Sequence, residues 1–299
     1  MPAQPGILDS LRPAGRYVVL DMPPDRVARD LVDRLGTLAI DDALVVGIGE
    51  PLVRALGRAL GRALGATLPG LRTFPALSGI ACAIPSTQGA LFVHARGADH
   101  GDTLLAMQRA LARLGPGLRI AEDIVGFRHL DGRDLSGYED GTENPTGDEA
   151  IAAALVHGAG PGLDGGSFVA AQRWIHDLGG FEKLSPRERD HVFGRARDTN
   201  DELPDAPPSA HVKRAAQEAY DPPAFMVRRS MPYGTVTEHG LYFVAYAASL
   251  GPYEAVLTRM TGREDGIVDG LFRFSRPVSG GYYWCPPVEG GRLDLRALR

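Results

Sequence analysis

RYVVLD, residues Arg16–Asp21, is a run of β-branched and aromatic side chains that indicates a β-strand. Apolar residues then recur every fourth position over Pro24–Gly36, which predicts a helix, and Ala43–Ile48 is again strand-like. The chain therefore begins with a β-α-β unit. An insertion follows, in which an Arg-Ala-Leu-Gly repeat over Arg54–Gly65 predicts a packed surface helix.

The same order of elements returns after this insertion. Strands are expected over Ala90–Arg96 and Arg119–Phe127. Between them, apolar residues spaced three and four apart over Leu104–Leu114 predict a helix. The first half thus carries the β-α-β-β-α-β order of a ferredoxin-like unit.

The second half repeats this order. Strands are expected over Ser167–Trp174, Phe225–Ser230, Leu241–Ala247 and, as the last one, Leu271–Phe274. Helices are expected over Pro186–Arg197 and Tyr253–Thr261. The first of these helices follows Ser185 and carries Glu188 in its first turn, which is the pattern of a capping box.

We therefore expect an α+β fold of two tandem ferredoxin-like domains, each an antiparallel sheet with helices on one face. The expected domains are 1–135 and 136–299, and a chain of 299 residues can form two cores. The two domains join within Arg128–Asp164, a stretch rich in Gly and Asp that shows little periodicity. A long loop of this kind in a compact protein is usually functional or disordered.

Composition and charge disfavour several classes of protein. The 32 Lys and Arg residues against 37 Asp and Glu residues give a net charge of -5, which disfavours a nucleic-acid partner. No apolar run approaches the about 20 residues that cross a bilayer, and Met1–Pro13 lacks a secretory-signal pattern, so we expect a cytoplasmic protein without a membrane partner. Cys82 and Cys285 lie far apart, which disfavours a disulfide framework or a Cys-ligated metal site.

Three segments carry candidate chemistry. Gly137–Pro145 crowds three acids between turn residues, so it is either a solvated loop or a carboxylate cation site, although it does not match the calcium-loop pattern. His211 follows a loop rich in Pro and acids and precedes a predicted strand, a place from which a side chain can point into a cleft. In that strand Arg228 and Arg229 point to opposite faces, and an inward arginine needs an anion, for which the acidic loop is a candidate.

Together these segments resemble the dye-decolorising peroxidases, specifically their shorter bacterial branch called class B. Gly137–Pro145 is similar to the distal-loop motif of this branch, and Val227–Gly234 is similar to its distal-arginine strand. Further matching segments follow in order along the chain: Thr87-Gln88, Leu91, His94, Gly126-Phe127-Arg128, Gln172-Arg173-Trp174, Gly194-Arg195, Gly240-Leu241-Tyr242-Phe243, Arg273-Phe274, Pro277-Val278 and Gly280-Gly281-Tyr282-Tyr283. Their order and spacing make the resemblance specific.

The resemblance implies a haem b peroxidase with two ferredoxin-like domains, in which the haem lies mainly against the second. By motif match, His211 is the proximal iron ligand, Asp140 the distal acid-base residue and Arg228 the distal arginine. Asp269 matches the acid that accepts the other N–H of the proximal imidazole and fixes its tautomer. In the implied reaction Asp140 moves a proton between the peroxide oxygens, and Arg228 stabilises the developing charge. With an ordinary carboxyl pKa of about 3.9, this reaction is expected to persist into acid.

Four residues leave alternatives open. Ser230 stands where some relatives carry Asn beside the peroxide, so it is a candidate but shorter hydrogen-bond donor. Arg229 is an alternative to Arg228 as the distal arginine, and Glu139 is an alternative to Asp140 as the distal acid. The motif alignment favours Arg228 and Asp140. Arg195 is a candidate partner of a haem propionate, or else a structural charge at a helix end.

Two other functions stay open from the residues alone. A haem-handling or haem-storage protein would need His211 but no distal pair of acid and cation. A non-haem carboxylate-metal enzyme would use His211 and the acidic loop as ligands. For the peroxidase, the expected partners are hydrogen peroxide and small electron donors such as dyes and phenolics. A homo-oligomer, dimeric or higher, is the default, and no long tail points to packaging in a protein shell.

Overall fold

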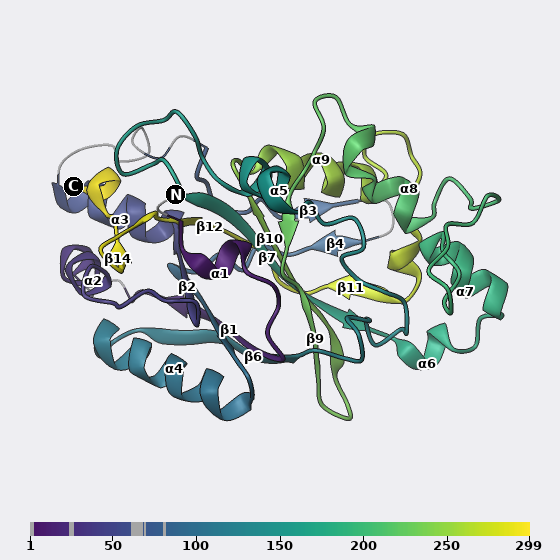
Figure 1. Cartoon of the computed structure of the whole chain (residues 1–299), viewed down its shortest axis with the longest axis horizontal. Helices are drawn as coiled ribbons and strands as arrows, with labels where there is room; N and C mark the ends of the chain where they lie inside the picture. The colour runs from purple at the N-terminus through teal and green to yellow at the C-terminus, as the bar shows by residue number, and fades with distance from the viewer. Residues whose placement is uncertain (1–2, 24–26, 61–67, 69, 80–81) are drawn as a thin grey trace.

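One antiparallel sheet organises the molecule, whose computed structural model describes residues 3–23, 27–60, 68, 70–79 and 82–299 (Figure 1). Ten strands form this sheet in the order β11-β7-β12-β2-β5-β1-β6-β9-β10-β8. Their bounds are β1 (Ala14–Asp21), β2 (Leu44–Gly49), β5 (Leu91–Gly97), β6 (Arg119–Phe127), β7 (Ser167–His176), β8 (Val227–Arg228), β9 (Met231–Gly234), β10 (His239–Ala247), β11 (Ser275–Pro277) and β12 (Gly281–Cys285). Strand β7 also pairs with β10, so the eight strands from β7 to β10 in this order close into a ring.

Shorter elements surround the ring. Two hairpins pair β3 (Leu77–Ser78) with β4 (Ala83–Ile84), and β13 (Val288–Glu289) with β14 (Arg292–Leu293). The helices are α1 (Pro5–Leu8), α2 (Ala28–Leu35), α3 (Glu50–Leu60), α4 (His100–Leu114), α5 (Gly147–Ala154), α6 (Leu178–Phe181), α7 (Pro186–Phe193), α8 (His211–Ala215) and α9 (Gly251–Met260), with short 3-10 turns η2 (Gln217–Ala219), η3 (Gly270–Arg273) and η4 (Arg296–Leu298). Helices α2, α3 and α4 lie at the end that carries both termini, α7 and α8 lie at the opposite end, and α9 lies between these ends (Figure 1). No helix in the described ranges is both long and apolar enough to span a bilayer.

The two halves of the chain contribute matching parts of the sheet. The first half supplies β6-β1-β5-β2 and the second half supplies β12-β7-β10-β9, and these parts join at β2–β12 and β6–β9. Every strand expected in the first half is present, with its ends within two residues of the prediction. The prediction of antiparallel α+β structure is thus confirmed. The sheets of the two halves, however, form one continuous ring.

Aromatic side chains fill the inside of this ring. Tyr17 on β1 stacks on Tyr242 of β10 with ring centroids 4.3 Å apart, although the two strands are not neighbours in the sheet. Such contact across the ring requires that both side chains point inward. Phe92, Tyr246 and Tyr283 belong to the same buried cluster. The interior is therefore a packed core rather than a site for a ligand.

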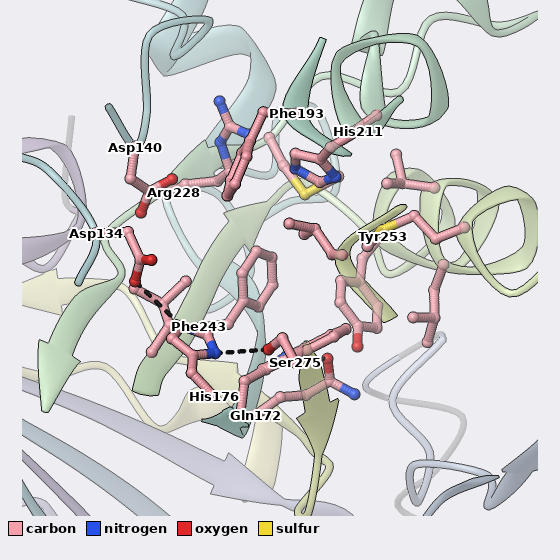
Figure 2. A pocket seen from close by; sticks show the side chains of 18 of the residues that line it. Asp134, Asp140, Gln172, His176, Phe193, His211, Arg228, Phe243, Tyr253 and Ser275 are labelled. Carbon is pink, nitrogen blue, oxygen red and sulfur yellow. Dashed lines mark hydrogen bonds and ion pairs between the residues drawn. The ribbon is translucent and has the colours of Figure 1, made fainter. Parts of the chain in front are cut away.

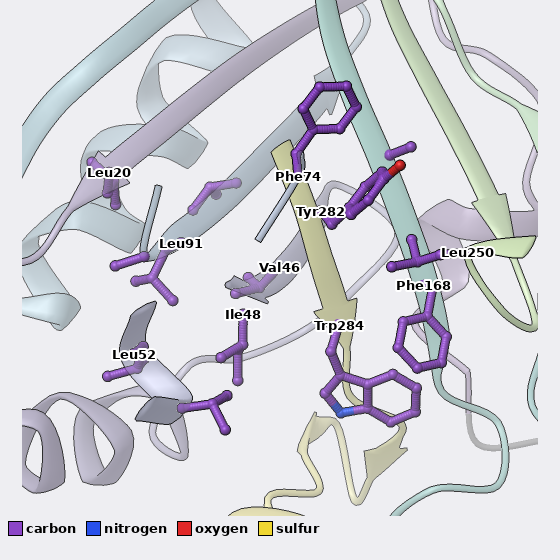
Figure 3. Close-up of a cluster of buried hydrophobic side chains, with 14 of the residues drawn as sticks. Leu20, Val46, Ile48, Leu52, Phe74, Leu91, Phe168, Leu250, Tyr282 and Trp284 are labelled. Carbon is purple, nitrogen blue, oxygen red and sulfur yellow. The ribbon is translucent and has the colours of Figure 1, made fainter. Parts of the chain in front are cut away.

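The outer face of the ring carries a second core that spans both halves of the chain. Figure 3 shows Val46 and Ile48 of β2 near Tyr282 and Trp284 of β12, with Phe168 of β7 beyond them. Each of these side chains is buried. The apolar surface removed from water, at about 25 cal/mol per Å², stabilises the junction between the halves.

Two strand predictions in the second half need correction. The predicted last strand, Leu271–Phe274, is wrong, because this segment forms η3, in which the Asp269 side chain accepts the Leu271 N–H and so caps a helical turn. The predicted strand Phe225–Ser230 is shorter, because Ser230 Oγ accepts the Val244 N–H at 3.2 Å and so interrupts the pairing with β10 at the point between β8 and β9. A local side-chain bond outweighs strand propensity in both places.

The helix predictions are largely confirmed. The capping box of Ser185 and Glu188 is present at the start of α7, but the helix ends at Phe193 instead of Arg197, since Gly194 adopts a left-handed φ of 83°. The repeat helix is present as α3 up to Leu60, and the rest of the predicted segment, residues 61–65, lies outside the described residues.

Candidate functional site

A pocket lies between the outer face of β7 and β10 and the helices α7, α8 and α9 (Figure 2). It encloses about 980 Å³, part of which is open to solvent. Gln172, Trp174 and His176 alternate along β7, so all three face the pocket. Much of the remaining wall is apolar, with Phe243 of β10 and Leu257 of α9 among its residues. Every described lining residue belongs to the part of the chain from Asp134 onward, so the second half builds this site.

His211 is the first residue of α8 and lines this pocket (Figure 2). Its Nδ1 lies 2.8 Å from Oδ2 of Asp269, whose side chain is fully buried. The other carboxylate oxygen of Asp269 accepts the Leu271 N–H at 2.8 Å, which fixes the carboxylate in place. Because Nδ1 donates to a carboxylate, Nε2 keeps its lone pair and is available to a ligand in the pocket.

Two glycines allow the elements around His211 to approach one another. A Cβ at Gly194, which directly follows α7, would lie 2.5 Å from Cγ1 of Val212 in α8. A Cβ at Gly270 would lie 2.8 Å from the carbonyl oxygen of Val192, and the Gly270 N–H donates to the Ser209 carbonyl at 2.7 Å. Larger residues would push α7, α8 and η3 apart and separate the histidine from its carboxylate.

Arg228 and Asp140 reach the pocket from β8 and from the acidic loop (Figure 2). Asn144, near the end of this loop, accepts the Arg228 N–H at 2.8 Å and donates to the Arg228 carbonyl at 3.0 Å. This pair of bonds joins the loop to the strand and brings the carboxyl and the guanidinium together. Arg228 Nε has no hydrogen-bond partner among the described residues, so the group is available to a small polar ligand.

Arg229 and Glu139, which adjoin Arg228 and Asp140 in the sequence, form hydrogen bonds and ion pairs with other groups. Arg229 is buried and donates to the carbonyl of Leu8 at 2.5 Å, on the opposite side of the strand from the pocket. Glu139 pairs with Arg133 at 3.1 Å and accepts a hydrogen bond from Asn200 at 2.9 Å. The geometry therefore favours Arg228 over Arg229, and Asp140 over Glu139.

The environment of Asp140 changes its acidity. The Asp140 residue is exposed to the pocket and to two adjoining cavities that it lines, but the protein around these cavities still reduces the solvation of its carboxyl. Burial raises the pKa of Asp140 above its ordinary value, the charge of Arg228 opposes this rise, Asp134 adds to it and His211 opposes it. The carboxyl thus loses its proton at a higher pH than a fully solvated aspartate does.

Ser230 and Arg195 lie outside the main pocket. Ser230 lines a smaller adjoining cavity that shares Asp140 and Arg228 with it, and its oxygen is the acceptor for Val244. Arg195 lines the outer mouth of the site, where its Nη2 lies 2.6 Å from Oε1 of Glu143. For Arg195 the geometry favours the structural charge, and a contact with a propionate stays a prediction.

Sequence reasoning missed a hydrogen-bonded chain on one wall of the pocket, formed by Asp134, His176 and Ser275 (Figure 2). Nothing in the spacing of these residues could have found it, since 42 residues separate the first pair and 99 separate the second. Within the described residues, no group of three or more His, Cys, Asp and Glu side chains is placed to hold a metal ion. His211 and the acidic loop therefore do not form the ligand set that a carboxylate-metal site would need.

Comparisons with known proteins agree on one family. The sequence model of the Dyp-type peroxidase C-terminal family matches residues 131–290. A dye-decolorizing peroxidase of Mycolicibacterium paratuberculosis is 30% identical over 310 residues, covering 96% of this chain and 85% of the relative. One from Mycobacterium tuberculosis is 32% identical over 225 residues, covering 73% of this chain and 67% of the relative.

Solved structures give the same result for the fold. DyPB from Rhodococcus jostii RHA1 superposes with a TM-score of 0.84 at 30% sequence identity, covering 96% of both chains. A variant of this Rhodococcus protein, solved in complex with haem, superposes with a TM-score of 0.82 at 30% identity, covering 94% of both chains.

Proposed function

The chain belongs to the dye-decolorising peroxidase family and is a haem-dependent peroxidase, and from this premise we propose which of its residues carry the reaction. The reaction reduces hydrogen peroxide with electrons from dyes, phenolics or other one-electron donors. The proposal rests on one observation: the same pocket holds a histidine bonded to a buried carboxylate and, on another wall, a carboxyl group within the electrostatic influence of a guanidinium.

The pocket residues fit haem. Apolar walls suit the faces of a porphyrin, and His211 offers Nε2 as the iron ligand while Asp269 holds its other nitrogen. The hydrogen bond to a carboxylate makes this imidazole a stronger electron donor, which favours oxidised iron. When bound, haem supplies the redox-active iron that reacts with peroxide and passes on its two oxidising equivalents.

Asp140 handles the proton in this proposal. Its carboxylate takes the proton from one oxygen of H2O2 and delivers it to the other, so that the departing oxygen leaves as water. Asp140 must be ionised to begin this transfer. Arg228 holds a fixed positive charge beside the O–O bond and stabilises the negative charge that develops as the bond breaks.

A protein that only stores or transfers haem needs the iron ligand but not these two distal groups. Asp140 and Arg228 together therefore favour peroxide turnover, in line with the family.

Replacing Arg228 with Leu is expected to slow the reaction of the ferric protein with H2O2 by about 10²- to 10³-fold, because a preorganised charge is typically worth about 3 to 4 kcal/mol in the transition state. Stopped-flow recording of the haem absorption band measures this rate. Arg228→Lys keeps the positive charge but lacks the planar guanidinium group, so its rate should lie between the rates of the wild-type protein and of Arg228→Leu. A wild-type rate in Arg228→Leu would remove the arginine from the mechanism.

The rate of this reaction should fall at a higher pH than the ordinary aspartate pKa implies. Burial raises the pKa of Asp140, so lowering the pH protonates the carboxyl earlier and removes the proton acceptor. We expect the rate constant to be flat at neutral pH and to fall with a single-proton slope in acid. A fall that instead follows a histidine titration, near pH 6.5, would count against Asp140 as the acceptor.

For the architecture, we propose that residues 1–135 and 136–299 are two ferredoxin-like domains, with the haem against the second. The matching strand orders of the halves and the location of the pocket support this division. The homo-oligomeric state and the cellular location stay predictions.

A further inference from the structure

A buried row of three hydrogen-bonded side chains forms part of the pocket wall and has no place in the reaction described above (Figure 2). Ser275 Oγ of β11 lies 2.7 Å from His176 Nδ1, at the end of β7. His176 Nε2 lies 3.1 Å from Oδ2 of Asp134, in the loop that leads to Asp140. All three residues are buried, so the row is held apart from bulk water.

Asp134 organises the loop that carries Asp140. Its N–H donates to the Tyr138 carbonyl at 2.8 Å, and its Oδ1 accepts the N–H of Ser136, also at 2.8 Å. The Asp140 N–H closes the same turn by donating to the Gly132 carbonyl at 3.1 Å. A displacement of Asp134 is therefore transmitted to Asp140 through a short, hydrogen-bonded turn. His176 ties this turn to the sheet.

Asp134 of this row is one of several charged groups around the distal carboxyl. Arg228 and His211 face it across the pocket, and Asp134 and Glu139 belong to its own loop. The smaller cavity on the other side of Asp140 adds three basic side chains, Arg128, His129 and Arg133. Among the other acids of this loop, Asp134 is the one whose charge raises the pKa of Asp140.

His176 helps to keep that charge in place. Burial alone would raise the pKa of Asp134, but the hydrogen bond from His176, together with the bonds from Ser136, outweighs it, so its pKa lies below the ordinary value. The other ring nitrogen of His176, Nδ1, is bonded to Ser275, and the centroid of the Phe274 ring lies 5.2 Å from that of the imidazole.

We propose that His176 is a positioning residue for the distal acid: acting through Asp134, it fixes the loop that carries Asp140 and holds a negative charge beside its carboxyl. This inference rests on the proposed function only in taking Asp140 as the proton acceptor. His176 itself does not touch the reacting atoms.

Two substitutions at His176 separate its contacts. The amide of Gln can occupy the place of Nε2 and donate to Asp134, whereas the shorter Asn reaches only the Nδ1 side and Ser275. We expect His176→Asn to lower the rate constant for H2O2 by about 10- to 10²-fold, because a small misplacement of a catalytic group has effects of this size. His176→Gln should stay within about threefold of wild type. Equal losses in both variants, with normal haem content, would overturn the positioning role.

Asp134→Asn tests the charge without removing the side chain. Its amide oxygen can still accept from Ser136, and His176 can change tautomer to accept from its amide nitrogen. Losing the negative charge lowers the pKa of Asp140, so the acid limit of the reaction should move to lower pH. Asp131→Asn removes an exposed carboxylate from the same loop and is the matched control, with an unchanged limit.

Infrared titration of the carboxyl bands, compared with Asp140→Asn, follows the proton on Asp140 in the resting ferric holoenzyme without turnover. The expected result is that Asp134→Asn moves this titration to lower pH and Asp131→Asn does not. No movement in Asp134→Asn overturns the inference. Movement of the infrared titration without movement of the rate profile would leave the His176–Asp134 role standing and contradict Asp140 as the proton acceptor.

Discussion

Replacing Asp140 with Asn is expected to lower the second-order rate constant for H2O2 by about 10²- to 10⁴-fold, the usual contribution of a positioned proton acceptor. The amide keeps the shape of the side chain and its place beside Arg228, but it cannot take a proton. Haem binding should persist, since the iron ligand lies on another wall of the pocket. Stopped-flow mixing of the ferric variant with H2O2 measures the rate. Because the variant lacks the carboxyl that becomes protonated, its rate constant should no longer fall in acid.

Glu139→Gln distinguishes the two acids of the loop. Glu139 is already paired with Arg133 and bonded to Asn200, so its loss should change the rate only a few fold. A mild Asp140→Asn variant together with a severe Glu139→Gln variant would reverse the assignment. A mild effect in both variants would mean that a water molecule in the pocket carries the proton. In that case Arg228→Leu should still react slowly.

Replacing His211 with Ala is expected to remove most of the haem from the purified protein. His211 is the pocket histidine whose Nε2 is left free, because its other nitrogen is bonded to Asp269. The second pocket histidine, His176, has both ring nitrogens occupied. The ratio of haem absorbance to protein absorbance measures the loss.

His157→Ala is the control for this variant, since His157 is exposed and lies outside the pocket lining. It should keep its haem and its spectrum. Full haem content and an unchanged spectrum in His211→Ala would show that another group binds the iron.

Local patterns in the sequence were enough to predict most of the longer strands and helices, but not the short ones. Alternation and apolar spacing predicted the four ring strands of the first half, but only β7 and β10 in the second half, where β9 and β12 were missed. The Ser185 capping box marked the start of α7 correctly. They failed at Leu271–Phe274, where the tertiary role of Asp269 as both cap and histidine partner imposes a helical turn. Ring closure through β7 and β10 depends on pairing between distant strands, which no local pattern encodes.

The site was predicted from motifs and clarified by geometry. Alternation alone could not say which of Arg228 and Arg229 faces inward, and the bond from Arg229 to the Leu8 carbonyl shows the direction of each. Asp134 and His176 carried no signal, because their roles arise only where the loop meets the end of β7. From the sequence only the ordinary aspartate pKa could be assumed, since the desolvation that raises the pKa of Asp140 depends on the fold.

The most direct test of the central claim is the visible absorption spectrum of the purified protein before and after addition of one equivalent of H2O2. The account predicts a strong Soret band that shifts within the mixing time and returns to its starting position when a phenolic or dye donor is added. A Soret band that peroxide leaves unchanged would contradict peroxidase function and favour haem handling, and a protein that cannot take up haem would contradict the assignment of the pocket.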